Sequence, residues 1–196
     1  MITWYRARFA AFFIMVILCF TIPAAAFYTS LQKQKNIKYQ IALHIKNENT
    51  QLEENILKAI SHTLYEESRD NGIDYRLVLA LMKIESNFQH DAVSPMGARG
   101  LLQIKPSLAK FMAGDMGIAW KGNTTIDDPN NNIKIGVRFL SQLVESFSNI
   151  NSALRAYNIG PVRIKELPRE KMVSPGGFPG LVLDEYNKNT AVLPDP

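Results

Sequence analysis

Apolar residues recur at helical spacing through much of this 196-residue chain. In the first such stretch every fourth residue is apolar: Leu52, Ile56, Ile60 and Leu64. This spacing predicts a helix that runs to about Arg69 and ends at Asn71-Gly72. Thr50-Gln51-Leu52-Glu53, at its start, has the form of a capping box.

A second helix is predicted over the apolar run 77–84, with Asp74 as its cap and Glu85-Ser86 at its end. Residues 91–100 follow as a loop rich in turn-forming residues. The short segment Leu101-Leu102-Gln103-Ile104 fits either a strand or the lead into a helix.

Further helices are predicted in the second half of the chain. Pro106 suits the start of a helix that ends before Gly114 or Gly117. Residues 121–132 form a predicted loop, which Asp128-Pro129 closes as another helix start. The long helix that follows has apolar residues at helical spacing: Ile133, Val137, Leu140, Val144 and Phe147. Ser152 opens a shorter helix that stops at Gly160-Pro161.

These patterns predict a mainly α-helical domain with at most a very small β element, because no alternating stretch is long enough for a sheet. The domain is expected over residues 51–196, with an irregular tail from about residue 166 and a last turn around Tyr186. Residues 27–50 are polar, dotted with lysine and only weakly periodic. We expect them to be a tether or a loosely attached helix.

Residues 1–26 have the pattern of a targeting segment. Arg6 and Arg8 precede a long uncharged apolar stretch, and Ala24-Ala25-Ala26 offers the small residues of a cleavage site. The stretch is also long enough to span a bilayer if it is not cleaved. The segment is therefore a signal peptide or a membrane anchor. Either outcome places the remainder outside the cytoplasm, because the arginines stay inside.

Composition and charge exclude several function classes. The net charge is +4, of which Arg6 and Arg8 supply two, so a nucleic-acid partner is not expected. Cys19 is the only cysteine and lies in the targeting segment, so the exported part has no disulfide and no thiol nucleophile. The three histidines lack the spacing of metal ligands. No metal and no cofactor is expected.

Glu85 is the residue in this chain that most suggests chemistry. A carboxylate in the last turn of a helix is repelled by the partial negative charge of the unpaired carbonyls. The apolar neighbours on the same helix withhold solvation, which raises the pKa of a carboxyl group further. A carboxylic acid that is still protonated near neutral pH meets the requirement for a general acid.

Three short motifs occur in order along the chain: Glu85-Ser86, Gly100-Leu101-Leu102-Gln103-Ile104 and Ala156-Tyr157-Asn158. In these motifs the sequence resembles the family-1 lytic transglycosylases, whose soluble lytic transglycosylase (SLT) domain has a lysozyme-like fold. The usual motifs of that family are Glu-Ser, Gly-Leu-Met-Gln and Ala-Tyr-Asn, so Leu102 replaces a methionine. The resemblance extends from about Ile73 to Val162, and includes the loop before Gly100.

The resemblance implies cleavage of the β-1,4 bond between MurNAc and GlcNAc in peptidoglycan, which makes glycan strands the expected partner. It implies that Glu85 is the catalytic residue, as acid and then as base, and that the product ends are 1,6-anhydroMurNAc. The other implied site residues are substrate contacts or neighbours of Glu85: Ser86, Ser94, Gln103, Tyr157 and Asn158. Among them, Tyr157 matches a tyrosine that hydrogen-bonds the catalytic glutamate. Ser86 either orients Glu85 or only ends the helix.

Two departures and two rival functions remain. Lys105 stands where the family often has methionine, which predicts a more basic subsite wall. Of the family's Glu-Thr-x-x-Tyr segment only Tyr186 is present. The rivals are hydrolysis on the same fold, as in goose-type lysozymes, and a non-catalytic wall-binding or scaffold protein. Intact Glu85, Gln103 and Tyr157 argue against the second rival. Membrane contact is expected only through an uncleaved N-terminal segment, and partners in a cell-envelope assembly stay unidentified.

Overall fold

A computed structural model describes residues 27–196 of the chain. The predicted signal or anchor segment 1–26, which contains Arg6, Arg8 and Cys19, lies outside the described residues. The chain forms two units, with the boundary between Ile37 and Lys38. In the first unit the described residues 27–37 are helical. Within residues 27–196 we find no helix that combines the length and the apolar character needed to cross a membrane.

The second unit begins with a helical segment over residues 38–48. Ile41 and Ile45, one turn apart, are fully buried, whereas Tyr39 is exposed. Of the two expectations for residues 27–50, a tether or a loosely attached helix, residues 38–48 fit the helix, and they belong to the second unit. Their apolar stripe has only one buried side chain per turn, so the periodicity along the sequence is weak.

Helix α2 (Glu54–Asp70) ends as predicted, with Asn71 as its C-cap. Its start differs from the prediction. Glu53 is the N-cap residue, and no side chain caps the helix there. The predicted capping box at Thr50 is wrong, because residues 50–52 form a turn before the helix begins.

Helix α3 (Tyr75–Ser86) follows and carries Glu85 in its last turn. The Asp74 carboxylate accepts the Arg76 backbone N–H at 2.8 Å, so the predicted cap is confirmed. Every residue from Tyr75 to Met82 is buried. The helix ends where Asn87 adopts a left-handed φ of 50°, which also confirms the predicted end.

The segment after α3 contains the small β element that was expected. Two isolated antiparallel bridges join Val93 to Arg99 and Arg99 to Ile104. Helix α4 (Pro106–Asp115) then begins with its proline in the first turn, as predicted. Helix α5 (Asn123–Asp127) lies where only a loop was expected, because five residues are too few to show a helical pattern.

Helix α6 (Pro129–Ser146) is capped by Asp128, as predicted. Helix α7 (Ile150–Ile159) begins two residues before the predicted start at Ser152. The reason is local, since the Asn149 side chain accepts a first-turn N–H at 2.8 Å and so caps the helix earlier. In the packing, α6 contacts α2, α5 and α7.

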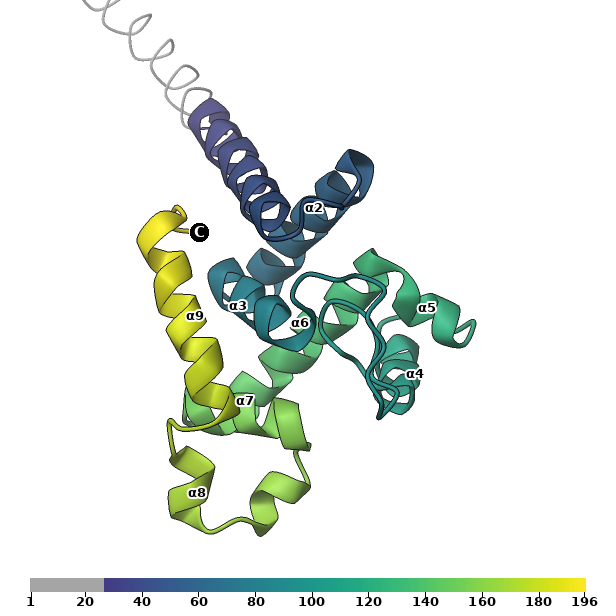
Figure 1. Cartoon of the computed structure of the whole chain (residues 1–196), viewed down its shortest axis with the longest axis vertical. Coiled ribbons are helices and arrows are strands. Elements are labelled where there is room, and N and C mark those ends of the chain that lie inside the picture. The colour runs from purple at the N-terminus through teal and green to yellow at the C-terminus, as the bar shows by residue number, and fades with distance from the viewer. Residues whose placement is uncertain (1–26) are drawn as a thin grey trace, which may run out of the picture. The chain divides into compact units, whose positions relative to one another are not determined.

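The C-terminal part is helical, so the predicted irregular tail from about residue 166 is wrong. The 3₁₀ turn η1 (Arg163–Glu166) and helix α8 (Arg169–Val173) lead into α9 (Phe178–Val192). Pro179 is in the first turn of α9, where a proline starts a helix rather than ends it. Helix α9 runs beside α3 and also contacts α7 (Figure 1).

The core of the second unit is formed where α2, α3, α6, α7 and α9 pack together (Figure 1). In the described residues the only β pairing is the two isolated bridges. The prediction of a mainly α-helical domain is therefore confirmed. The C-terminal end of α3, where Glu85 lies, faces the irregular segment between α3 and α4.

Candidate active site

Glu85 borders a pocket of ≈ 510 Å³, called here the Glu85 pocket. Its walls come from the end of α3, residues 94–105, the start of α4, α6, and the end of α7 with the segment that follows it. Five of the predicted site residues line it: Glu85, Ser94, Gln103, Tyr157 and Asn158. Segments that are far apart in the sequence thus meet at one place.

Burial raises the pKa of Glu85 from its ordinary value of 4.5 to about 7. Desolvation disfavours the charged form of a carboxyl group, so the neutral acid persists to neutral pH. Of the two causes expected from the sequence, this shift reflects the loss of solvation on burial. Among the residues that line the pocket, all of them in the described part of the chain, Glu85 is the only carboxyl. It can therefore act as a lone general acid.

Ser86 does not line this pocket. Its side chain is buried, and its hydroxyl lies 2.9 Å from the Leu101 carbonyl and 3.1 Å from the Met82 carbonyl. The hydroxyl donates to these oxygens and joins the end of α3 to the segment before α4. The expectation that Ser86 contacts substrate is not supported by this position, because the neighbouring backbone encloses the side chain.

Tyr157, on α7, packs against Phe139 with ring centroids 5.4 Å apart. Its hydroxyl donates to the Leu102 carbonyl at 2.8 Å, rather than to Glu85 as the resemblance implied. Burial raises the pKa of Tyr157 well above 10, and the nearby charge of Glu85 raises it further. Tyr157 therefore stays neutral, and its oxygen can act toward Glu85 only as an acceptor.

Gln103 holds its own loop together. Its Nε2 donates to the Gly100 carbonyl at 2.9 Å and to the Ala92 carbonyl at 3.2 Å. Its backbone adopts a positive φ of 45°, which is uncommon for a residue with a side chain. Both amide protons are thus engaged within the protein. The Oε1 acceptor is the part of Gln103 that remains for a ligand in the pocket.

Ser94 and Ala98 close a turn on another wall of the pocket. The Ser94 N–H donates to the Ala98 carbonyl at 2.9 Å, and the Ser94 hydroxyl accepts the Ala98 N–H at 3.0 Å. Because the hydroxyl is an acceptor in this turn, its own proton remains to be donated to a ligand. Asn158 is exposed on the last turn of α7 and borders the same pocket.

Asn132, on α6, was missed by the sequence analysis although it organises the segment before α4. Its fully buried side chain accepts the Leu102 N–H at 2.9 Å and donates to the carbonyls of Arg99 at 2.9 Å and Ile126 at 3.1 Å. Gly100 adopts a φ of 75°, and a Cβ there would lie 2.3 Å from the Asn132 amide. A glycine is required at this position by both its backbone and its neighbour.

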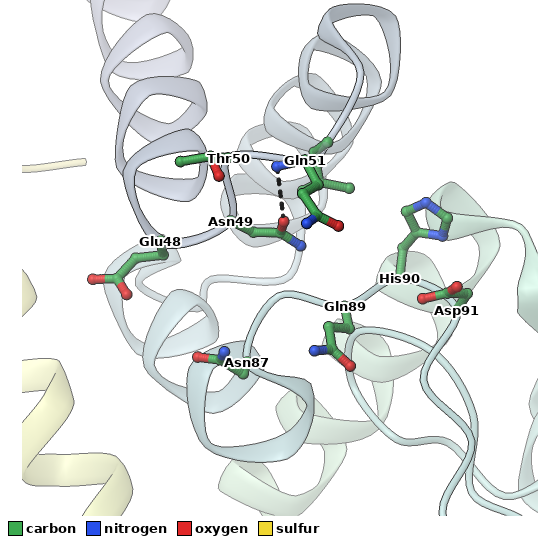
Figure 2. Close-up of a pocket in the computed structure, with 9 residues that line it drawn as sticks. Glu48, Asn49, Thr50, Gln51, Asn87, Gln89, His90 and Asp91 are labelled. Carbon is green, nitrogen blue, oxygen red and sulfur yellow. Dashed lines mark hydrogen bonds between the residues drawn. The ribbon is translucent and has the colours of Figure 1, made fainter.

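A second pocket of ≈ 560 Å³ lies beside the chain that follows α3 (Figure 2). Figure 2 shows polar side chains around it from residues 48–51 and from residues 87–91. His90 and Asp91 line this second pocket and not the Glu85 pocket. Asp91 is therefore not a second carboxyl in the Glu85 pocket, and it stands at the start of the turn-rich segment predicted over residues 91–100.

Tyr186 lies outside the Glu85 pocket. Its hydroxyl donates to the Asp74 carboxylate at 3.0 Å. Asp74 caps the start of α3, and Glu85 lies in its last turn, so about 16 Å of helix separates the two residues. The tyrosine retained from the family segment thus supports the helix start rather than the pocket.

The transglycosylase SLT domain family model matches residues 62–174. Among similar curated proteins, the soluble lytic murein transglycosylase of Salmonella typhimurium is 31% identical over 116 residues, which are 58% of this chain and 18% of that protein. The transglycosylase of Enterobacteria phage PRD1 is 29% identical over 120 residues, 61% of this chain and 40% of that protein. The chain thus spans less than half the length of either relative.

Solved structures give the same fold. The lytic transglycosylase Slt from Pseudomonas aeruginosa, crystallised as an inactive mutant, aligns with a TM-score of 0.56 at 27% identity, over 68% of this chain and 25% of that one. The 70-kDa soluble lytic transglycosylase SLT70 from Escherichia coli aligns with a TM-score of 0.60 at 20% identity, over 81% of this chain and 31% of that one. These alignments confirm the expected helical SLT fold. Because the family model covers more than half of its residues, this chain belongs to the transglycosylase SLT domain family.

Proposed function

We propose that this protein is a lytic transglycosylase that cleaves the β-1,4 bond between MurNAc and GlcNAc in peptidoglycan without consuming water. The observation that carries the proposal is the lone carboxyl of the Glu85 pocket, with its pKa of about 7. A glycosidase that follows the usual mechanism needs two carboxyl groups beside the scissile bond. A transglycosylase needs one, since the attacking hydroxyl belongs to the substrate.

In the proposed reaction Glu85 acts first as an acid and then as a base. The neutral carboxyl gives its proton to the glycosidic oxygen, and the bond from that oxygen to C1 of MurNAc breaks. The resulting carboxylate takes the proton from the C6 hydroxyl of the same sugar. The C6 oxygen then bonds to C1 and forms a 1,6-anhydro ring. Glu85 ends the cycle protonated, so no net proton is taken up or released.

Tyr157 supports the acid form of Glu85 in this scheme. Its hydroxyl proton is committed to the Leu102 carbonyl, so only its lone pairs are available to a neighbour. A protonated Glu85 can donate to such an acceptor, whereas a carboxylate cannot. The packing of Tyr157 on Phe139 keeps this oxygen in place. We therefore assign Tyr157 a positioning role, distinct from proton transfer.

Three further side chains are proposed to hold the sugar. Ser94 retains a hydroxyl proton to donate, and Gln103 retains the Oε1 acceptor, which together suit the carbonyl and N–H of an acetamido group. Asn158, exposed at the pocket edge, offers both a donor and an acceptor. These contacts fix the ring so that the C6 hydroxyl meets C1, which is the positioning that such a ring closure requires.

Digestion of purified sacculi tests the reaction. Released muropeptides are analysed by mass spectrometry, which separates anhydro ends from reducing ends by the mass of one water. We expect 1,6-anhydroMurNAc ends. Reducing ends would identify the protein as a hydrolase of the goose-type lysozyme kind. Binding to sacculi without release would identify a wall-binding module.

The variant Glu85→Gln tests the assigned acid. We expect product release to fall by about 10²–10⁴-fold, because the amide keeps the shape of the side chain but has no acidic proton. Glu166→Gln makes the same change at an exposed residue that does not line the pocket, and should leave release unchanged. Circular dichroism confirms that both variants are folded. Retained activity in Glu85→Gln would refute the role of Glu85.

A location in the bacterial cell envelope fits this function. Peptidoglycan lies outside the cytoplasm, where the predicted targeting segment directs the chain. A similar protein of Alkalilimnicola ehrlichii is named membrane-bound lytic murein transglycosylase F 1, and is 30% identical over 115 residues. We propose that any membrane contact of this chain is made by its N-terminal segment.

A further inference from the structure

Two cationic side chains line the Glu85 pocket from different elements. Lys105 directly precedes α4, and Arg163 is the first residue of η1. Both are exposed, and neither makes a hydrogen bond or an ion pair within the part of the chain that the structure describes. Arg99 differs from these two residues because it is paired with an acid. It lies in the same loop region but outside the pocket lining, and its guanidinium donates to the Asp127 carboxylate at 2.6 and 2.9 Å.

The charge of the pocket follows from these residues. Glu85 is the only acid in the lining and, with a pKa of about 7, is at most half ionised up to neutral pH, so the two positive charges exceed the negative charge there. A concave surface with unbalanced positive charge attracts an anion.

The substrate proposed above carries an anion at a defined place. Muramic acid differs from glucosamine by a lactyl ether on C3, which ends in a carboxyl group. In the wall this carboxyl is either free or joined to a peptide that has carboxylates of its own. GlcNAc has no such group. A carboxylate is thus the feature by which one sugar of the strand can be distinguished from the next.

We propose that Lys105 and Arg163 bind a carboxylate on the C3 substituent of the muramic sugar, so that the pocket selects strands that carry this charge. The inference rests on the proposed function and adds a substrate requirement to it. The Arg163 guanidinium can form two parallel hydrogen bonds to one carboxylate, and the Lys105 ammonium supplies a positive charge on a flexible side chain. Lys105 is also where the chain departs from the methionine common in its family.

The test compares the full-length protein with the double variant Lys105→Met/Arg163→Gln on three substrates. These are intact glycan strands with peptides, strands from which an amidase has removed the peptides, and chitooligosaccharides, which have no carboxylate. We expect kcat/KM on intact strands to fall about tenfold, through KM, and its dependence on salt to weaken. Competitive binding of chitooligosaccharides should change by less than about twofold. A defect only on peptide-free strands assigns the lactyl carboxylate, and a defect only on intact strands assigns a peptide carboxylate. A defect on both shows that the pair binds whichever carboxylate the C3 substituent carries.

The matched control is Lys110→Met/Arg169→Gln, which removes the same two charges from exposed positions in α4 and α8 outside the pocket. It should retain the kinetics and the salt dependence of the unmodified protein. The inference is overturned if the Lys105/Arg163 variant matches this control on both strands, or if it loses chitooligosaccharide binding equally. Failure of the proposed function is a different result, in which the unmodified protein releases no product at all.

Discussion

At the scale of single residues, the acidity of Glu85 depends on the fold more than on the helix that carries it. The sequence places this glutamate at a helix end among apolar neighbours, and that suffices to suggest a raised pKa. The size of the shift comes from loop and α7 residues that close over it, because burial is its cause. The same burial has a cost in stability, which can be measured without any substrate.

The variant Glu85→Gln should be more stable than the unmodified protein at pH 8. The carboxyl has a pKa near 4.5 in the unfolded chain and about 7 in the fold, so between these pH values only the unfolded state releases its proton. The stability that the neutral carboxyl provides is complete below pH 4.5 and is lost as pH rises to 7. Urea unfolding should show a gain for the variant of up to about 3 kcal/mol at pH 8.

This gain should vanish near pH 4.5, where both side chains are neutral. Glu166→Gln, at an exposed position, should differ from the unmodified protein by less than about 0.5 kcal/mol at both pH values. If the difference in the free energy of unfolding between Glu85→Gln and the unmodified protein did not change with pH, the pKa of Glu85 would not be raised in the fold.

The partners of individual side chains are what the sequence predicts least well. Residue types and motifs identified Tyr157 and Gln103, and both line the pocket. Their hydrogen bonds go to the carbonyls of Leu102, Gly100 and Ala92, which no residue type signals. Backbone carbonyls are identical along the chain, so only the fold decides which one a side chain meets.

At the scale of elements, the segment before α4 takes its shape from α6. It has almost no regular structure of its own, and two isolated bridges are its only β pairing in the described chain. The Asn132 amide binds this segment at two points, at Leu102 and Arg99, and binds α5 at a third, the Ile126 carbonyl. Gly136, one turn further along α6, leaves room for Leu102, since a Cβ there would lie 2.4 Å from that side chain.

Asn132→Ala should therefore disrupt the pocket. It leaves a buried N–H and two carbonyls without the partner they have in the fold, and each such loss costs about 1–3 kcal/mol. We expect the free energy of unfolding to fall by about 2–4 kcal/mol in urea titrations, with loss of activity on sacculi. Asn131→Ala, at the preceding and less buried residue of α6, should cost less than about 1 kcal/mol. Equal effects of the two variants would contradict the role of Asn132.

Helix caps show why some elements were predictable and others were not. Asp74 and Asp128 cap the helices that directly follow them, and both were recognised from neighbouring residues alone. Asn132 looks like any polar residue of a helix, because its three partners lie 6 to 33 positions away. Interactions within a few residues can be predicted from the local sequence, whereas interactions between distant segments cannot.

At the scale of the whole folded unit, the packed structure extends beyond the residues that the family model matches. The match ends at residue 174, whereas α9 lies beyond it and packs along α3. The Asn189 amide, almost fully buried, donates to the Arg76 carbonyl at 3.0 Å. The sequence suggested irregularity here because glycines and prolines are dense over residues 175–180. Gly180 is in fact needed for packing, since a Cβ would lie 2.5 Å from the Pro175 carbonyl.

Removal of residues 175–196 should consequently destabilise the fold, although it leaves the matched region whole. The deletion exposes the surfaces of α3 and α7 that α9 covers, and it removes the buried side chains of Val182 and Leu193, whose burial is worth about 1.5–3 kcal/mol each. Thermal unfolding followed by circular dichroism should show a lower midpoint or no cooperative transition. Asp195→Asn, whose side chain is 88% exposed, should cost less than about 1 kcal/mol. An unchanged midpoint in the truncated chain would show that α9 is dispensable.

The carbonyls of Leu101 and Leu102 are neighbours in the chain, and each accepts a hydroxyl from a different helix. Ser86 anchors the end of α3 to the first, and Tyr157 anchors α7 to the second. The residue next to Glu85 and the tyrosine are therefore held by two consecutive peptide units. If a long polymer pulls on the pocket, the two helices shift together and the spacing of their side chains is preserved. In the proposed reaction we therefore expect a bulky strand to be accommodated by other parts of the pocket lining, at residues 94–98 and 160–163, rather than by movement of Glu85 relative to Tyr157.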